Sequence, residues 1–362
     1  MFDTFANNAK QVYNRLSDDL SKNIFEDRIL FSLTDNIDFI RHICSISHGS
    51  VYEKCINNAV SFVNRSTNGI IYYGAGYMGA GLISINSKIE AFCDRDVNKI
   101  GHLIFGHRVI SPDMLVKEYP NSNVVITVID MNTALEISNE LVNMGLNKGN
   151  IYHYMDSFGL SSNYFHNLMA EQYFDSEIIV PKLTENEIFV DAGCCNCYTD
   201  FRFTEFTNNK YKKIIAFEPS PKQYLECIEK SRDIQNISIH NSGLWNENTF
   251  LSFDDTCTIG GTHIIDYAGA NATQVKLVKL DDVLDGEEAT FIKMDIEGAE
   301  LNALKGAEQT IIKYRPKLAI CVYHKPEDIF EIPSYLLSLH SDYNLYFRHY
   351  SFWHGETVLY AV

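Results

Sequence analysis

Acidic residues follow three of the apolar segments in the second half of this 362-residue chain. They are Asp191 after Ile188–Val190, Glu218 after Ile214–Phe217, and Asp295 after Phe291–Met294. Short apolar runs are typical of buried strands, and open α/β sheets bind their ligands outside the carboxyl ends of the strands. A single acidic residue at such a point is more often a helix cap or a turn residue. Because the pattern recurs at three strand ends, it indicates a ligand site.

The segment Glu187–Asp200, EIFVDAGCCNCYTD, joins the first of these strands to a small-residue loop and the start of a helix. Asp191 and Gly193 can shape this loop around a charged amino-acid moiety or a sulfonium. Glu218 suits the two hydroxyls of a ribose, because a carboxylate accepts two hydrogen bonds at once. Anionic side chains disfavour phosphates in the same place. The residues therefore predict a ribosyl cofactor without phosphate, and S-adenosylmethionine fits.

The residues around Asp295 could remove a proton from an alcohol. Lys293 precedes Asp295 by two positions, so both side chains project from the same face of the strand. His324 follows a later apolar segment and reaches the same rim; its unperturbed pKa of about 6.5 makes it the predicted base, with Asp295 as the alternative. His324 fits equally well as a helix cap or as the partner of a carboxylate. The alternative is a divalent metal held by Asp295 and Glu297. It is the weaker interpretation, because the sequence does not show that a third ligand lies near these two carboxylates.

Cysteines at positions 194, 195 and 197 invite a metal interpretation. Zinc sites usually combine a C-x-x-C pair with a second, distant pair, and the sequence shows no second pair. We therefore predict that these cysteines are small apolar residues of the loop and assign no metal to them.

A second candidate corner lies in the first half of the chain. Gly74, Gly76 and Gly79 form a G-x-G-x-x-G pattern after the apolar run Ile70–Tyr73, and Asp94 follows the next apolar run. Such glycines permit the turn, the approach of a phosphate and the packing of a helix, and the acid can bind a ribose. A purely structural turn explains the glycines equally well. No Tyr-x-x-x-Lys pair or other obvious hydride-transfer residue follows, which counts against an active dehydrogenase.

The spacing of apolar residues divides the chain into four parts. Residues 1–66 form a helical N-terminal segment, residues 67–155 a small Rossmann-like α/β domain, and residues 156–185 a connector. In the small domain, strands are expected at 70–73, 89–93, 123–129 and 151–152. In residues 186–362, alternating strands and helices, among them an edge strand over 275–280 and helices over 221–230 and 300–313, end in an antiparallel pair, Tyr343–Phe347 and Thr357–Ala361. The predicted fold class is α/β, with a seven-stranded Rossmann-like sheet that ends in an antiparallel hairpin.

The second half resembles the FkbM-type family of S-adenosylmethionine-dependent methyltransferases. The matching motifs, in order, are FVDAG with a following Asn and Thr, FEPSP, LWNE, KLDDVL, IKMDIEGAE, KLAICVYHKPEDI and YNLYFRHYS…ETVLYAV. They span residues 186–362, and KMDIEGAE is the most specific. The resemblance implies a class I methyltransferase fold and methyl transfer to oxygen, commonly on a sugar or other glycan-related hydroxyl.

The same resemblance implies roles for individual residues. Asp191, Gly193 and Glu218 are expected to bind the cofactor, and Ser242 and Leu244 are expected to flank the adenine. Apart from the resemblance, Asp295 is also predicted to contact the cofactor, because it lies at a neighbouring strand end. One position departs from the family, whose members usually have glycine where this chain has Cys197. A positive φ at this cysteine would be strained.

Composition limits the partners. The formal charge of −17 and the lack of an evident basic patch argue against nucleic acid as a partner. No apolar run approaches the roughly 20 residues of a membrane span, the N-terminus does not resemble a signal peptide, and the nine cysteines lack a disulfide-like spacing. We expect a cytoplasmic enzyme with a small-molecule or saccharide acceptor, and a homo-oligomer is compatible with the sequence. The alternative functions are an oxidoreductase or sensor that binds a nucleotide or nucleotide-sugar through the first corner, and a binding module without turnover.

Overall fold

The computed structural model describes residues 2–66, 68–159, 168, 171–254 and 272–362. The chain forms two compact units, and each combines segments that are distant in sequence. The first unit comprises Met1–Ser32, Ala170–Tyr350 and Gly355–Val362, and the second comprises Leu33–Met169 and Ser351–His354. The division at residues 66, 155 and 185 stays a sequence-based prediction, and part of the connector 156–185 lies outside the described residues.

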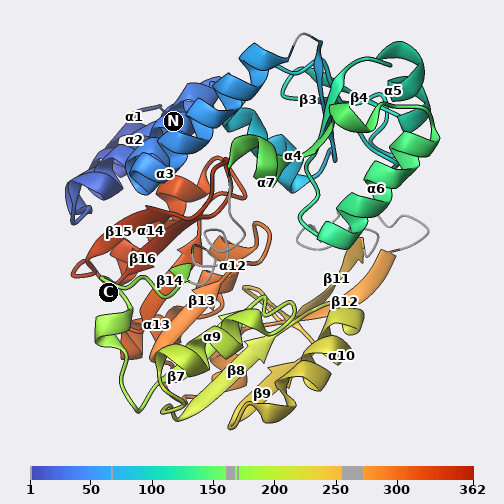
Figure 1. The fold of residues 1–362 in the computed structure, drawn as a ribbon. Helices are drawn as coiled ribbons and strands as arrows, with labels where there is room; N and C mark the ends of the chain where they lie inside the picture. The colour runs from blue at the N-terminus through green and yellow to red at the C-terminus, as the bar shows by residue number, and fades with distance from the viewer. Residues whose placement is uncertain (1, 67, 160–167, 169–170, 255–271) are drawn as a thin grey trace. The chain divides into compact units, whose positions relative to one another are not determined.

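A seven-stranded sheet forms the centre of the first unit (Figure 1), in the order β15-β16-β14-β13-β7-β8-β9. Its strands are β7 (Ile188–Ala192), β8 (Lys213–Phe217), β9 (Ile237–His240), β13 (Phe291–Met294), β14 (Lys317–Cys321), β15 (Leu345–His349) and β16 (Thr357–Ala361). Strand β16 is antiparallel to both β14 and β15, whereas the pairs from β14 to β9 are parallel. The predicted α/β fold and its terminal antiparallel hairpin are confirmed.

The register of this sheet places the predicted strand ends side by side. Lys293 of β13 pairs with Asp191 of β7, and Ala192 of β7 pairs with Phe217 of β8. All five residues of β7 are buried, as expected for a central parallel strand covered on both faces. On one face, the rings of Phe189 and Phe203 stack with centroids 4.5 Å apart. The packed sheet thus fixes the loops that follow β7, β8 and β13.

The helices of the first unit follow the predicted alternation with one change. They are α1 (Phe2–Arg15), α2 (Asp19–Thr34), which continues past Ser32, α9 (Tyr198–Phe206), α10 (Pro221–Lys230), α11 (Leu280–Leu284), α12 (Glu300–Lys305), α13 (Glu308–Tyr314) and α14 (Asp328–Leu339). The single helix expected over residues 300–313 is two helices, α12 and α13. Asp281 explains the break, because its carboxylate accepts hydrogen bonds from the backbone N–H groups of Gln309 and Thr310 and so caps α13.

A smaller sheet also belongs to the first unit, with the order β10-β12-β11. Its strands are β10 (Gly243–Leu244), β11 (Thr249–Asp254) and β12 (Ala272–Val278). The strand expected over residues 275–280 ends at Val278, because α11 begins at Leu280.

The second unit contains a six-stranded sheet in the order β3-β4-β2-β1-β5-β6 (Figure 1). Its elements are α3 (Ile37–Arg65), β1 (Ile70–Tyr73), α4 (Tyr77–Gly81), β2 (Ala91–Cys93), β3 (Leu103–Ile104), β4 (His107–Ile110), α5 (Pro112–Glu118), β5 (Asn123–Ile126), α6 (Met131–Asn143), β6 (Ile151–His153) and α7 (Tyr154–Phe158). The predicted strands at 70–73, 89–93, 123–129 and 151–152 are present, and every pair except β3–β4 is parallel. Sequence reasoning missed β3 and β4, which are short and partly exposed and so carry little apolar periodicity. Among the described residues, no helix combines the length and apolar character needed to cross a membrane.

Candidate functional site

Lys293 lies beneath the loop that follows β7. Its Nζ donates hydrogen bonds to Asp191 Oδ1 at 2.9 Å, to Gly193 O at 2.8 Å and to Ala192 O at 3.3 Å. The Lys293 side chain is 2% exposed and that of Asp191 is fully buried. Burial opposes the charge, but the carboxylates of Asp191 and Asp295 raise the pKa of Lys293 above its usual range. The buried ammonium thus supports the loop after β7 through its three acceptors.

Gly193 is where the loop after β7 passes closest to β13. Its φ is +81°, and a Cβ atom there would lie 2.1 Å from the backbone oxygen of Asp295. Only glycine tolerates both the left-handed backbone and this approach. The two predicted strand ends, at Asp191 and Asp295, are therefore brought together by a glycine that no other residue can replace without moving the backbone.

Glu218 joins the end of β8 to the same loop. Its Oε2 accepts a hydrogen bond from the Cys195 N–H at 3.0 Å, and its Oε1 accepts one from the Ser220 N–H at 2.8 Å. The side chain is buried, and burial raises the pKa of Glu218 to about 7. Each oxygen keeps capacity for a further hydrogen bond, which a ligand diol could use.

The end of β9 lies next to that of β8. Asn241 Nδ2 donates to the backbone oxygen of Glu218 at 2.9 Å, and Ser242 and Leu244 follow as buried residues. All the predicted cofactor residues therefore lie at or just beyond the carboxyl ends of β7, β8, β9 and β13.

Three carboxylates surround the His324 ring beyond β14. Its Nδ1 lies 3.0 Å from Glu300 Oε1, and its Nε2 lies 3.4 Å from Asp295 Oδ1 and 3.5 Å from Glu297 Oε2. The His324 side chain is 8% exposed. Burial alone would lower the pKa of His324, but Glu300, Asp295 and Glu297 raise it to about 9. At neutral pH the ring is therefore an imidazolium, which cannot accept a proton.

The carboxylates around His324 differ in basicity. Burial acts against ionisation of Asp295, but the charges of Lys293 and His324 lower its pKa below the usual range. Burial raises the pKa of Glu297 to about 7, against the opposing charge of His324. Glu297 also has a left-handed φ of +55°, which non-glycine residues adopt at a cost of about 1 kcal/mol or more. Of these two carboxylates, Glu297 is thus the better proton acceptor near neutral pH.

Asp295, Glu300 and His324 also form one of the compact groups of ligand-type side chains among the described residues. Their ligand atoms lie within 4.8 Å of one another. The pair suggested by the sequence was Asp295 with Glu297, whereas Glu300 is the second carboxylate of this group.

Tyr173 contributes to the site from the segment that the sequence assigned to a connector. Its hydroxyl donates to Asp295 Oδ2 at 2.7 Å and accepts a hydrogen bond from Gln172 Nε2 at 2.9 Å. Lys293 Nζ lies 5.1 Å from the centre of the Tyr173 ring. Sequence reasoning missed Tyr173, because nothing in the mixed aromatic and polar segment distinguishes it from the neighbouring tyrosines and phenylalanines.

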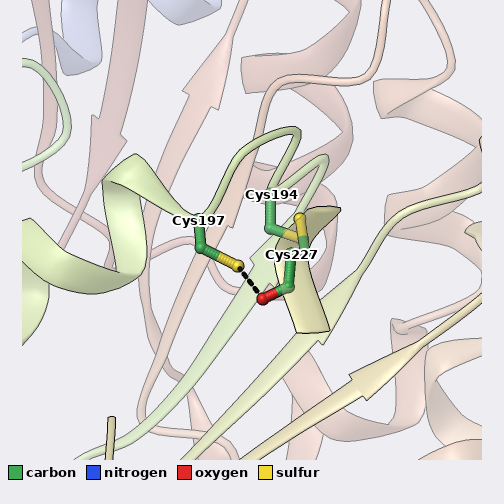
Figure 2. Close-up of side chains that lie close together, drawn as sticks. All are labelled: Cys194, Cys197 and Cys227. Carbon is green, nitrogen blue, oxygen red and sulfur yellow. Dashed lines mark hydrogen bonds between the residues drawn. The ribbon is translucent and has the colours of Figure 1, made fainter. Parts of the chain in front are cut away.

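Three buried cysteines gather beside the loop after β7 (Figure 2). Cys194 and Cys197 come from the loop itself, and Cys227 comes from α10. Cys197 has a φ of +61°, the strained conformation considered for this position. Sequence reasoning did not associate Cys227 with the other two, because only the packing of α10 brings it near.

The first corner, in the second unit, satisfies its own polar groups. Asp94 Oδ2 accepts a hydrogen bond from the Ala75 N–H at 2.8 Å and lies 3.4 Å from Lys99 Nζ. A Cβ atom on Gly79 would lie 1.9 Å from the backbone oxygen of Gly74, so the glycines serve close packing of the turn. Gly76 has open space around it and precedes α4, which is only five residues long.

Comparison with known proteins identifies the second half of the chain. Residues 191–352 match the family model described as Methyltransferase FkbM domain. Together with the mixed α/β fold and its mainly parallel sheet, this match defines a methyltransferase. Residues 191–352 form an FkbM-type methyltransferase domain. A search of curated proteins found no match.

Several solved structures are similar to the chain at low identity. A methyltransferase FkbM from Methylobacillus flagellatus KT is 19% identical, with 91% of this chain and 100% of that chain covered and a TM-score of 0.49. An rRNA methylase from Streptococcus thermophilus is 16% identical over 54% of this chain and 91% of that chain, with a TM-score of 0.32. The fibrillarin of Aeropyrum pernix, solved with natively bound S-adenosyl-L-methionine, is 12% identical over 55% of this chain and 76% of that chain, with a TM-score of 0.36. Because these scores are low, the classification rests on the family match.

Proposed function

We propose that this protein transfers a methyl group from S-adenosylmethionine to a hydroxyl oxygen of a sugar, glycan or related small molecule. The observation that carries the proposal is the convergence of Glu218 and the Gly193 loop with the acidic group around His324, inside a domain of methyltransferase type. The first part suits a ribosyl cofactor, and the second suits proton transfer from an alcohol. We also propose a cytoplasmic location.

The residues present fit the cofactor. Glu218 is the proposed partner of the ribose hydroxyls, and Ser242 and Leu244 are the proposed neighbours of the adenine. Asp191 Oδ2 is a buried oxygen without a hydrogen-bond partner, which leaves it available to a cationic group of the ligand. Lys293 and Gly193 act as positioning residues, because they fix the loop on which the cofactor would lie.

When bound, the cofactor supplies a methyl group on a sulfonium sulfur, and the demethylated cofactor is the leaving group, a neutral thioether. The chain must then accept the proton of the alcohol as the new carbon–oxygen bond forms. We propose Glu297 as the acceptor, in place of the predicted base His324, because its pKa of about 7 leaves it ionised in part at neutral pH. The imidazolium of His324 stabilises the negative charge of Asp295 and Glu297 and orients both.

Calorimetry with S-adenosylmethionine and its demethylated product tests the cofactor assignment. We expect Kd values in the micromolar range for the wild type and weakening of about 10- to 100-fold in Glu218→Gln, which loses charge-assisted hydrogen bonds. Glu226→Gln is the matched control, since Glu226 is a half-exposed carboxylate on α10 paired with Lys230. Wild-type protein that binds neither compound would overturn the proposal.

The acceptor is tested by transfer of a labelled methyl group to a panel of free saccharides and extracted glycans. Mass spectrometry should locate the label on an oxygen atom. Label on nitrogen or carbon would refute O-methylation while leaving the cofactor assignment intact. The alternative, a nucleotide-linked function of the first corner, gains no support, because Asp94 is already engaged by Ala75 and Lys99.

A further inference from the structure

The thiols of Cys194, Cys197 and Cys227 lie close together in the interior (Figure 2), where Cys197 Sγ donates to the backbone oxygen of Cys227 at 3.7 Å and Cys227 Sγ donates to that of Cys195 at 2.9 Å. Cys194 and Cys197 have the C-x-x-C spacing of a metal-binding turn, and Cys227 faces them from α10. Their three Sγ atoms all lie within 4.8 Å of one another. The relative exposures of the three residues are 2%, 0% and 0%. Structural zinc sites have four ligands, so these three cysteines would supply all but one of them.

The spacing of the sulfurs agrees with a tetrahedral metal. Cys194 Sγ and Cys227 Sγ are 3.7 Å apart. Zinc–sulfur bonds of about 2.3 Å in a tetrahedron separate two sulfurs by about 3.8 Å. Cys197 Sγ lies within 4.8 Å of both other sulfurs, and binding a metal would replace its hydrogen bond to the backbone oxygen of Cys227.

Asp200 provides an independent observation beside the three thiols, although its oxygens lie outside the set of ligand atoms within 4.8 Å of one another, so the side chain must shift to reach a metal. Its carboxyl is fully buried, and neither oxygen has a hydrogen-bond partner. It lies one turn beyond Cys197 in α9, on the same side of the helix, and its charge acts on the thiols of Cys194 and Cys197. Burial raises the pKa of Asp200 well above its usual range, so in the absence of a cation the carboxyl binds a proton, and a nearby cation would favour the carboxylate. A metal bound to the cysteines would supply that cation.

We infer that Cys194, Cys197 and Cys227, with Asp200 as the fourth ligand, form a structural zinc site that joins the loop after β7 to α10. Thiolates exclude magnesium and calcium, which prefer oxygen ligands. A carboxylate as fourth ligand favours zinc over copper(I), for which three soft thiolates suffice. A disulfide between Cys194 and Cys227 would leave the nearness of the Cys197 thiol unexplained.

A metal site would also account for the strained backbone conformation of Cys197. Glycine would adopt its φ of +61° without strain, so a cysteine there costs about 1 kcal/mol that a metal–thiolate bond offsets. All four ligands are protein side chains, so the zinc has no open position for substrate. Its role is to hold the loop that begins at Gly193, and it stands apart from methyl transfer.

The first test is the zinc content of the full chain, purified under reducing conditions without a metal-affinity tag and measured by plasma mass spectrometry. We expect about one zinc per chain in the wild type and in Cys195→Ser, and less than about a tenth of that in Cys227→Ser. Cys195 is the matched control, because it lies in the same loop but outside the three-cysteine group. Equal zinc in Cys227→Ser and the wild type would overturn the site.

The second test does not depend on Cys227→Ser, so that it holds even where that variant fails to fold. Zinc is removed with a chelator under reducing conditions, and Tm is measured before and after zinc or magnesium is added. We expect Tm to fall on removal and to recover with zinc alone. Cobalt added to the apo protein should give the thiolate charge-transfer and tetrahedral d–d bands, and Asp200→Asn should shift the d–d bands. A chain that is purified without zinc, shows no Tm response and gives no cobalt bands would refute the inference.

Discussion

Lys293 Nζ lies 2.9 Å from Asp191 Oδ1, and both side chains are buried between the central strands β13 and β7. The pair links the two strands at the level where the ligand loops begin. Because Lys293 also donates to the backbone oxygens of Ala192 and Gly193, it determines where the loop after β7 turns. The same ammonium therefore supports both the fold and the shape of the proposed cofactor site.

Replacing Lys293 with methionine should destabilise the protein by about 3–5 kcal/mol, because Asp191 becomes an uncompensated buried charge. Urea unfolding followed by circular dichroism measures this change. Lys213→Met is the control, since Lys213 and Glu287 form a partly exposed pair at 2.7 Å that contributes about 1 kcal/mol or less. Similar losses of unfolding free energy in the two variants would show that the buried pair stabilises the protein no more than the partly exposed pair does.

Replacing Gly193 with alanine should weaken S-adenosylmethionine binding by at least about 10-fold, since the added Cβ meets the Asp295 backbone oxygen and φ is positive. Calorimetry measures the effect. Gly76→Ala adds the same methyl group in the other glycine loop, where the space is open and φ is −105°. That variant should bind the cofactor as the wild type does. Unchanged binding in Gly193→Ala would mean that the loop moves freely.

Much of the fold could be predicted from the sequence, because its strands are short apolar runs with clear boundaries. Helix α10 begins at Pro221 after the cap Ser220 and ends at Lys230, as predicted. Strands β3 and β4 carry no such signal. The break between α12 and α13 depends on a cap from Asp281, about 28 residues earlier in the chain, and local propensity does not report such a contact.

The candidate site was predictable in its positions and less so in its chemistry. Strand ends locate Glu218 and Asp295, since parallel strands present them at one edge. The protonation of His324 depends on three carboxylates, and the sequence does not reveal how close they lie. Tyr173 and Cys227 reach the site by tertiary packing alone, and no local pattern marks them.

Replacing Glu297 with glutamine should lower kcat by about 100- to 10,000-fold, as expected for loss of a general base. The Kd for the cofactor should stay within about twofold, because the proposed role lies in proton transfer. Wild-type kcat should fall as the pH drops through about 7, where the Glu297 carboxylate becomes protonated. Initial rates of methyl transfer at several pH values around 7 measure the change in kcat and its pH dependence.

Glu327→Gln is the control for that experiment, since Glu327 is an exposed carboxylate beside the start of α14. It should keep the wild-type rate and pH profile. A Glu297→Gln variant with the wild-type rate would transfer the role of base to Asp295 or to solvent.

Replacing His324 with glutamine should destabilise the protein most at low pH. The pKa of His324 is about 9 in the folded protein and about 6.5 when unfolded. Its stabilising charge is therefore fully present below about pH 6.5 and is lost as the pH rises to about 9. The difference in free energy of unfolding between wild type and variant should shrink by up to about 3 kcal/mol over that range.

Tyr323→Phe is the control, because it removes the adjacent hydroxyl without removing a positive charge, so its effect on the free energy of unfolding should be nearly constant with pH. Urea titrations at about pH 6, 7.5 and 9.5 measure these differences. A constant difference for His324→Gln would show that the ring is neutral in the folded protein, and His324 would then return as a candidate base.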